Sequence, residues 1–238
     1  DTDTDTDTDT DTDTDTDTDT DSDTDTDTDT DIELSAEELA ALTTEEINNL
    51  KAAGVGLINV TEGAGVISAA VAQDLIDAGI GIDEGDTITL QDADDTALVN
   101  VLESDSAKVG ALGLNVVDKG TAGVADSYTA SAELVTAMDA LDDSPSFGAE
   151  DTVSLDADST VLQSDLVGKA GALGVTVLNI GADDIDVAAS VAASIGSAGI
   201  TGLDIDGADS GSAVLSAAEA QSLIEAGAIG DCLAHFID

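Results

Sequence analysis

The sequence predicts an α/β protein whose body repeats a unit of helix, glycine and strand, after an extended tract of alternating Asp and Thr. The tract covers residues 1–31, and Ser22 is its single exception. Helix-capping patterns, glycines and short aliphatic runs then recur through residues 32–238, the predicted repeat body. Units that recur every 25–34 residues indicate a solenoid-like stack or an open parallel sheet. One compact α/β domain with look-alike units is the alternative.

The Asp-Thr tract contains 16 aspartates and no basic or apolar residue. In an extended chain the period of two would put all carboxylates on one face, about 7 Å apart, where they repel each other. A tract without apolar side chains has no burial energy to offset the entropy of ordering, so a disordered acidic linker is one interpretation. Any order must come from bound cations such as calcium, from strand pairing with another chain, or from attached glycans.

The tract also offers a hydroxyl at every second residue, a spacing that suits dense O-linked glycosylation. The candidate hydroxyls are those of Thr2, Thr4, Thr6, Thr8, Thr10, Thr12, Thr14, Thr16, Thr18, Thr20, Ser22, Thr24, Thr26, Thr28 and Thr30.

Two capping boxes open the body. Ser35–Glu38 and Thr43–Glu46 both place Ser or Thr three residues before Glu, which predicts two short helices. The second helix should run to about Ala53, where Gly54 ends it, and 57–60 then reads as a strand.

Glycine follows the end of most predicted helices, where a left-handed residue closes the helix. Successive junctions lie 25, 34, 61, 25 and 28 residues apart, and the longest gap has room for a further helix near Ser131–Leu141 without a glycine. Pro145 lies in the irregular segment after that helix. The junction glycines are Gly54, Gly79, Gly113, Gly174, Gly199 and Gly227.

Short aliphatic strands follow most of these junctions, and further strands follow acidic turns. Strand, helix and strand at this spacing predict right-handed parallel crossovers. The predicted strands are Leu57–Val60, Thr87–Leu90, Leu114–Val117, Thr152–Leu155, Val175–Ile180 and Leu203–Ile205.

Charge excludes several classes of function. The net charge is −49, and outside the tract 53 − 16 = 37 acidic residues face only four lysines. This excludes binding to nucleic acid or to anionic membranes, and it favours divalent cations or a high-salt setting. No apolar run reaches the 18 residues that membrane insertion needs. Because the chain starts at Asp1 and not Met, we expect a processed product or a fragment.

Acidic turns after the strands are candidate calcium ligands, because calcium takes six to eight oxygens from carboxylates and carbonyls. A solvated acidic turn is the alternative for each cluster. The best candidate is Asp204–Asp209, where Gly207 permits a sharp turn, although it lacks the bidentate Glu of an EF-hand. The candidate ligands are Asp92, Asp94, Asp95, Asp183, Asp184, Asp186, Asp204, Asp206 and Asp209, with further acidic turns at Asp83, Glu84 and Asp86 and at Asp156 and Asp158.

No catalytic constellation is present, and we expect the protein not to be an enzyme. Cys232 and His235 are the only thiol and imidazole, too few for a zinc site, and they are better explained as packing of the last turn. Phosphate-binding glycine loops with a lysine are absent from the sequence.

A resemblance rests on the run Val66–Gly79, followed by Asp86–Leu90, with Val214–Gln221 repeating its opening. These segments resemble tandem repeats of very large exported bacterial surface proteins. The resemblance implies adhesin-like, surface-layer-like or filament-forming material.

The leading hypothesis is therefore an extracellular structural protein that assembles with copies of itself into a filament or surface layer. Neighbouring copies, cations or O-glycans would order the tract. The alternatives are a calcium-dependent adhesin or binding segment with the tract as a stalk, and a surface that templates mineral or ice.

Overall fold

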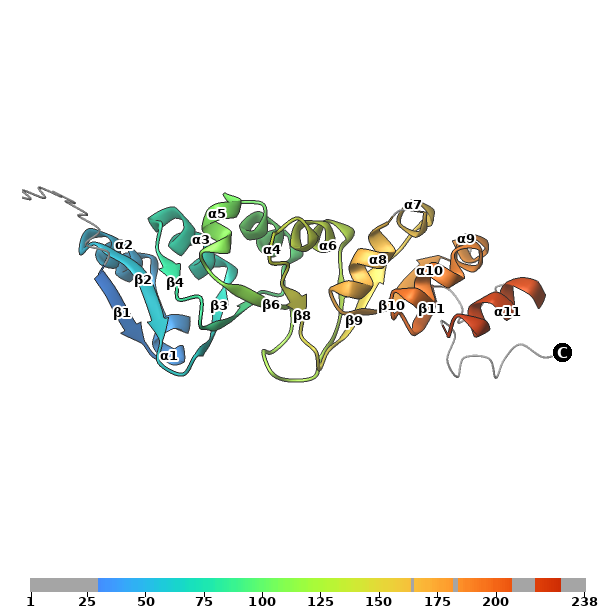
Figure 1. Ribbon diagram of the computed structural model, residues 1–238, viewed down its shortest axis with the longest axis horizontal. Coiled ribbons are helices and arrows are strands. Elements are labelled where there is room, and N and C mark those ends of the chain that lie inside the picture. Colours follow the sequence, from blue (N-terminus) through green and yellow to red (C-terminus); the bar gives the residue numbers. More distant parts are fainter. Residues whose placement is uncertain (1–29, 164, 182–183, 207–216, 228–238) are drawn as a thin grey trace, which may run out of the picture.

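The computed structural model describes residues 30–163, 165–181, 184–206 and 217–227. Within them the chain is an α/β protein with three sheets, and all the strand pairings are parallel. Its elements follow one another in chain order along the long axis of the molecule, with most helices on one side and the strands on the other (Figure 1). The α/β class and the parallel strands predicted from the sequence are confirmed.

The first sheet has the order β1-β2-β4, and it pairs Ile32 with Ile58 and Leu57 with Gly81. Both predicted capping boxes form at the starts of the two helices that precede β2. The bounds are Thr30–Leu34 (β1), Ala36–Ala40 (α1), Thr44–Ala52 (α2), Val55–Val60 (β2) and Gly81–Ile82 (β4).

Strand β1 begins inside the Asp-Thr tract, because Thr30 and Asp31 are its first two residues. The strand therefore crosses the expected boundary between residues 31 and 32. Residues 1–29, with the glycosylation candidates from Thr2 to Thr28, lie outside the described residues.

The second sheet has the order β3-β5-β6-β8. Its strands span Ala64–Ser68 (β3), Thr87–Gln91 (β5), Leu114–Asp118 (β6) and Ser146–Phe147 (β8). The helices between β3 and β6 span Ala69–Ala78 (α3), Asp95–Leu102 (α4) and Ser106–Gly110 (α5), whereas β7 of the third sheet and helix α6 lie between β6 and β8 in the sequence.

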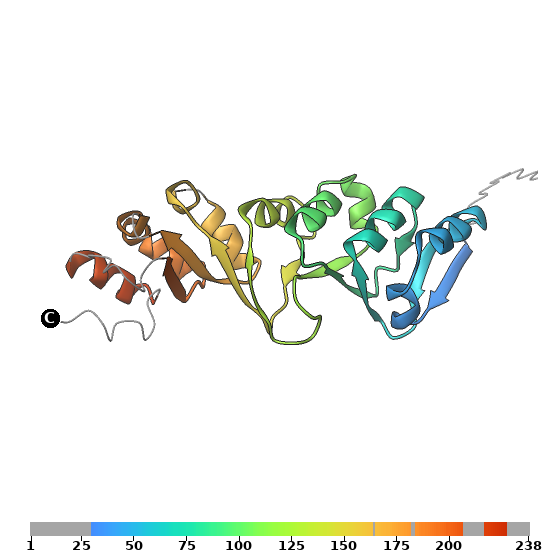
Figure 2. The same cartoon turned by 180° about the vertical axis from the view of Figure 1, so that it is seen from behind.

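The third sheet has the order β11-β10-β9-β7. The loop of residues 119–126 connects it to the second sheet and protrudes on the strand side (Figures 1 and 2). The strands are Ser127–Ala130 (β7), Thr152–Asp156 (β9), Val175–Gly181 (β10) and Gly202–Asp206 (β11), and the helices are Ala132–Asp139 (α6), Ser159–Leu162 (α7), Leu166–Ala172 (α8), Ile185–Ser190 (α9), Ala192–Ser197 (α10) and Ala217–Glu225 (α11).

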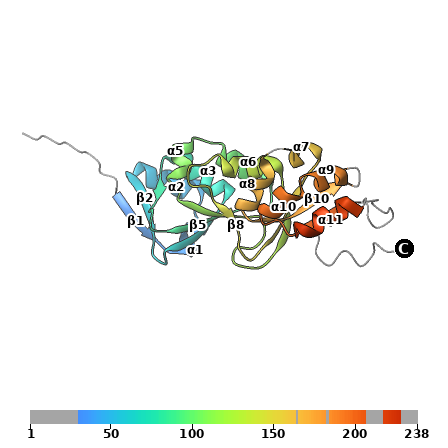
Figure 3. The ribbon, with the colours of Figure 1, turned by 45° about the vertical axis from the view of Figure 1, so that its right-hand side comes forward.

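Helices from successive units pack side by side in chain order. Contacts run from α2 to α3, on to α4, α6, α8 and α10, and then to α11. Figure 3 shows this row of helices along one side of the body. Each unit is therefore covered mainly by the units that precede and follow it in the sequence.

The core is made almost entirely of Leu, Ile, Val and Ala, as the composition indicates. Fully buried examples are Ile58 in the first sheet, Leu90 in the second and Leu155 in the third. Tyr128 and Phe147 add one edge-to-face aromatic contact, with ring centroids 6.1 Å apart, where the second and third sheets meet. None of the described helices is long and apolar enough to cross a membrane.

All six predicted junction glycines have positive φ, for example +74° at Gly79, which ends α3. The six predicted strands are also confirmed, with ends that differ by at most two residues. Strands β1, β3, β4, β7 and β8 were not among the predicted strands. Strands β4 and β8 have only two residues each, and β3 and β7 are short and lead directly into a helix without a turn signal.

Two other glycines permit close contacts between neighbouring helices. Gly171 in α8 lies against the backbone carbonyl of Ala198, at the end of α10, and Gly196 in α10 lies against the carbonyl of Ala226, at the end of α11. A Cβ at either glycine would overlap the carbonyl oxygen. The same contact thus recurs 25 residues later, between the next pair of helices.

We expect Gly171→Ala to lower the free energy of unfolding by about 1–3 kcal/mol, because the added methyl group forces α8 away from α10. Gly168→Ala in the same helix is the matched control. A Cβ there meets nothing within 4 Å, so the better helix propensity of Ala should leave stability unchanged or raise it by up to about 1 kcal/mol. Urea unfolding of both variants checks this, and equal stabilities would contradict the close contact.

Candidate functional site

The predicted acidic turns lie where strands end. Asp92 follows β5, Asp156 ends β9 and Asp184 directly precedes α9, while Asp204 is exposed within β11. Parallel strands present their carboxyl ends at the same edge of a sheet, which is where ligands bind in many open α/β proteins. Asp183, Asp209, Cys232 and His235 lie outside the described residues, as do the side chains of Asp186 and Asp206.

The cluster after β5 builds a helix start. Asp92 Oδ1 accepts a hydrogen bond from the backbone N–H of Asp94 at 3.0 Å, and Asp94 Oδ1 accepts one from Thr96 N–H at 2.9 Å. Asp94 is thereby the N-cap of α4. These oxygens satisfy backbone donors that the first turn of a helix leaves unpaired.

Asp95 ties α4 to the following units. Its Oδ2 accepts a hydrogen bond from the backbone N–H of Ser131, the N-cap of α6, at 2.8 Å. Its Oδ1 lies 2.5 Å from Lys119 Nζ, and both side chains are largely shielded from solvent. Lys119 also donates to the backbone carbonyl of Thr129 in β7, so this one lysine connects α4 to the third sheet.

Two predicted acidic turns meet in a pocket of about 510 Å³ at the carboxyl ends of β9 and β10. Asn179 Nδ2 donates to Asp156 Oδ1 at 3.0 Å, which fixes one wall. Asp158 caps the N-terminus of α7. Its pKa lies below the ordinary value, chiefly because it accepts a hydrogen bond from the Thr160 hydroxyl and, to a smaller extent, because it accepts hydrogen bonds from backbone N–H groups. The acidic residues that line this pocket are Glu133, Asp156, Asp158 and Asp184.

This carboxyl-edge pocket, lined by Glu133, Asp156, Asp158 and Asp184, is therefore rich in oxygen atoms and negative charge, which are the properties that a hard cation selects. In the described part of the chain, no group of three or more His, Cys, Asp or Glu side chains is close enough to hold a metal ion as it stands. Calcium binding stays a prediction, and it would require these side chains to move together.

Other polar side chains join one unit to the next. In each case a side-chain oxygen accepts a hydrogen bond from a backbone N–H that lies 25–27 residues earlier in the chain. We call these contacts the inter-unit bonds. The pairs are Glu62 with Ala36 N–H at 3.0 Å, Asp86 with Val60 N–H at 2.7 Å, Asn115 with Ile88 N–H at 2.8 Å, and Asp151 with Asp126 N–H at 3.0 Å.

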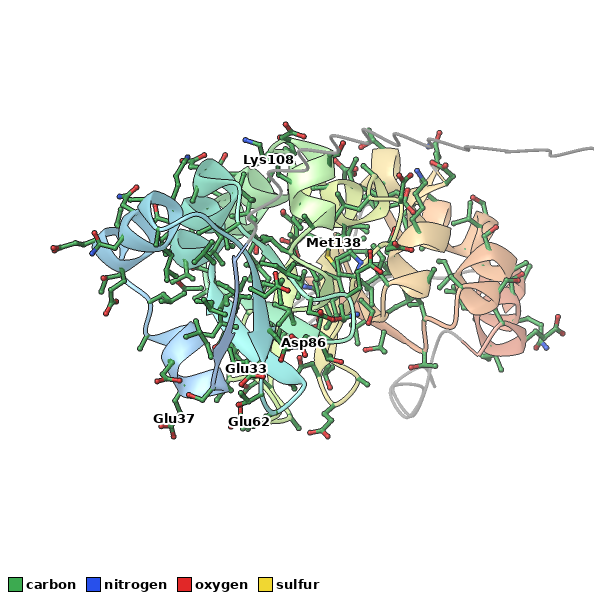
Figure 4. The ribbon with its side chains drawn as sticks, turned by 60° about the vertical axis from the view of Figure 1, so that its left-hand side comes forward. Glu33, Glu37, Glu62, Asp86, Lys108 and Met138 are labelled. Carbon is green, nitrogen blue, oxygen red and sulfur yellow. The ribbon has the colours of Figure 1, made fainter. Side chains whose placement is uncertain are left out.

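Asp86 makes the most buried of the inter-unit bonds, with 8 % of the residue exposed (Figure 4). It belongs to an acidic turn that the sequence suggested for calcium, yet one of its carboxylate oxygens is bonded to the end of β2. The requirement to pair a buried backbone N–H explains why an acidic residue lies this deep.

Asp118 is the most buried carboxyl group among the described residues, with 2 % exposed. It accepts a hydrogen bond from the backbone N–H of Gly120 at 2.7 Å. Burial raises the pKa of Asp118, that bond lowers it less, and repulsion from Asp151 and Asp126 adds to the rise. Burial and the adjacent Asp151, which accepts from the Tyr128 hydroxyl at 3.1 Å, likewise raise the pKa of Tyr128.

Sequence reasoning did not identify the inter-unit bonds or the cluster around Lys119. The signal for Asp118 and Lys119 was present, since an acid–base pair directly follows the predicted strand Leu114–Val117. The inter-unit bonds have only a weak signal in the sequence. The signal is a side chain with an oxygen atom, which lies either in the turn before a strand or within the strand itself.

Comparison with known proteins does not assign the chain to a family. No protein-family model matches it, and no curated protein matches its sequence.

We expect Asp86→Ala to lower the free energy of unfolding by about 1–3 kcal/mol, because it leaves the buried N–H of Val60 without an acceptor. Asp86→Asn is the control, since its amide oxygen can still accept that hydrogen bond. The Asn variant should lose clearly less stability in urea unfolding. If both variants lost the same amount, the carboxylate charge would matter more than the hydrogen bond.

Asp118→Asn should raise stability at pH 7, because it removes a buried charge while its amide oxygen still accepts from Gly120 N–H. A carboxyl group whose pKa is raised by folding favours the folded state more as the pH falls through that raised pKa. The advantage of the variant should therefore shrink on acidification. Unfolding curves of both proteins at several pH values test this, and a less stable variant at pH 7 would contradict it.

Proposed function

We propose that this chain is an extracellular structural protein, not an enzyme, that assembles with copies of itself into a filament or a surface layer. The repeat body would form a solenoid-like array, and neighbouring copies, cations or O-glycans would order the Asp-Thr tract. The observation that carries the proposal is the chain-order packing of the units, in which one helix row and the inter-unit bonds repeat along the body.

Arrays of this kind are quasi-one-dimensional, because each unit contacts mainly its neighbours. Their stability comes from the interfaces between units, and their long surfaces suit lateral contact with other molecules. The elongated outline of the body supports this interpretation (Figure 1).

The position of the tract also supports an assembly role. Strand β1 is the first strand of its sheet, and the tract runs directly into it through Thr30 and Asp31. A segment that enters at a sheet edge is well placed to reach a neighbouring copy, where strand pairing could satisfy its backbone.

Net charge sets a condition on assembly. A chain of net charge −49 repels its own copies, so contact requires screening by salt or bridging by divalent cations. Calcium is the cation that the carboxylates favour by their chemistry.

We expect the purified chain to be monomeric at low ionic strength and to form large species in millimolar calcium chloride. Sedimentation velocity and negative-stain electron microscopy measure this, with sodium chloride of equal ionic strength as the control for screening. Assembly in both salts would indicate screening, and assembly in calcium alone would indicate bridging. A monomer under all conditions at high protein concentration would contradict the proposal.

A calcium-dependent adhesin or binding segment is the second candidate, and the carboxyl-edge pocket is the observation that favours it. In that case calcium would bind to the monomer with defined stoichiometry. The double substitution Asp156→Asn and Asp184→Asn would lower the affinity of the monomer for calcium. Calorimetric titration of calcium into the monomer separates this candidate from simple charge screening.

A further inference from the structure

Helices in the row contact their neighbours through recurring positions, counted back from the glycine that ends each helix. In α2, α8 and α10, the residue three positions before that glycine faces the end of the next helix in the row. Lys51 Nζ of α2 donates a hydrogen bond to the carbonyl of Asp77 in α3 at 3.1 Å. Gly171 and Gly196 lie in the same way against the carbonyls that end α10 and α11.

Two helix faces follow from these contacts. We call the positions three, six and seven before the glycine the forward face, because they share one side of a helix, and the positions one, two and five before it the rear face. Between α2 and α3, and again between α10 and α11, the forward face of one helix and the rear face of the next line one pocket. The residues of the second pocket include Ala192, Ala193 and Gly196 on α10 and Ser222, Glu225 and Ala226 on α11.

Helices α3 and α11 have the same three residue types on their forward faces. They are Ala72, Gln73 and Ile76 in α3, and Ala220, Gln221 and Ile224 in α11. In α3, where α4 follows, Ile76 is 3 % exposed, and Gln73 accepts a hydrogen bond from the Ser104 hydroxyl, just after α4, at 3.4 Å. On α11, which no described helix follows, Ile224 is 42 % exposed. The forward face of α11 is thus built like one that a further helix covers.

The rear face of α2 is free at the other end of the row. It consists of Asn49, Ala52 and Ala53, which are all exposed. Figure 1 shows α2 and α11 at opposite ends of the body. Neither of these two faces contains a charged residue, although the chain carries 53 acidic residues.

We propose that the forward face of α11 docks against the rear face of α2 in a second copy of this chain, so that the helix row continues from one molecule into the next. The inference deepens the proposed function, on which it rests, by naming the two surfaces that join. Ile224 would lie against Ala52 and Ala53 and lose its contact with water.

A second copy is the occupant because its α2 offers the counterpart that a forward face meets inside the molecule. No described helix covers either face, so the contact displaces no helix packing that is already present. Two copies that approach through other surfaces bring carboxylates together, whereas these faces are uncharged and meet less repulsion. A contact between two different faces repeats from copy to copy, and it gives an open filament unless the rotation closes a ring.

The test places a carboxylate in either half of the contact. Ile224→Glu changes α11 and Ala52→Glu changes α2, in the full chain. Val124→Glu is the matched control, because Val124 is likewise an exposed apolar side chain, 51 % exposed, and lies in the loop of residues 119–126, away from both faces. Circular dichroism and urea unfolding establish that each variant is folded, and sedimentation velocity in calcium chloride measures assembly.

Ile224→Glu and Ala52→Glu should each raise the protein concentration that assembly requires about tenfold or more, because the contact would bury an unpaired carboxylate. Val124→Glu should assemble as the wild-type chain does. An equimolar mixture of the Ile224→Glu and Ala52→Glu variants retains one intact α2 face and one intact α11 face. It should therefore form a one-to-one dimer that does not grow.

Several outcomes would overturn the contact. If Ile224→Glu and Ala52→Glu assemble as the wild-type chain does, the contact is wrong and the proposed function stands. A less stable Ile224→Glu variant, with assembly unchanged by Ala52→Glu, would show that residues 228–238 of the same chain cover α11, which also overturns it. If the wild-type chain forms only a closed ring that both substitutions abolish, the contact is supported and the filament or layer fails. A wild-type chain that stays monomeric overturns both.

Discussion

Hydrogen bonds from backbone N–H groups to side-chain oxygens of the next unit are the interaction on which this structure depends. The chain has four lysines for 53 acidic residues, so ion pairs can neutralise only a few carboxylates. Acidic residues therefore bond to backbone donors, at helix starts through Glu38, Glu46 and Asp158 and between units through Glu62 and Asp86. An acidic chain can be stable in this way because backbone N–H groups are numerous and must be paired when they are buried.

Local signals in the sequence were sufficient for much of the fold. The capping boxes at Ser35 and Thr43 and the glycines that end helices depend on residues a few positions apart, so the sequence displays them directly. The inter-unit bonds connect residues 25–27 positions apart, and no local pattern specifies which acidic residue of a turn faces inward. This is why Asp86 was grouped with candidate calcium ligands, and why the burial of Asp118 was not anticipated.

The same distinction applies to the candidate site. Sequence patterns placed acidic residues at the ends of strands, and the structure brings Asp156, Asp158 and Asp184 to one pocket. Several of the carboxylates that were considered as ligands already have structural partners. Asp92 and Asp94, for example, accept hydrogen bonds from backbone N–H groups at the start of α4. Structural use of these carboxylates and the strong net charge are both compatible with the proposed surface protein, whose assembly would respond to cations.

Residue-resolved hydrogen exchange of the backbone amides is the most direct test of the inter-unit bonds. If they join the units into one cooperative body, the N–H groups of Val60 and Ile88 should exchange as slowly as the amides of the buried strand centres, close to the rate that global unfolding sets. Rapid exchange at these two amides, with slow exchange elsewhere in β2 and β5, would show that the units are held together without these bonds and would contradict the central claim.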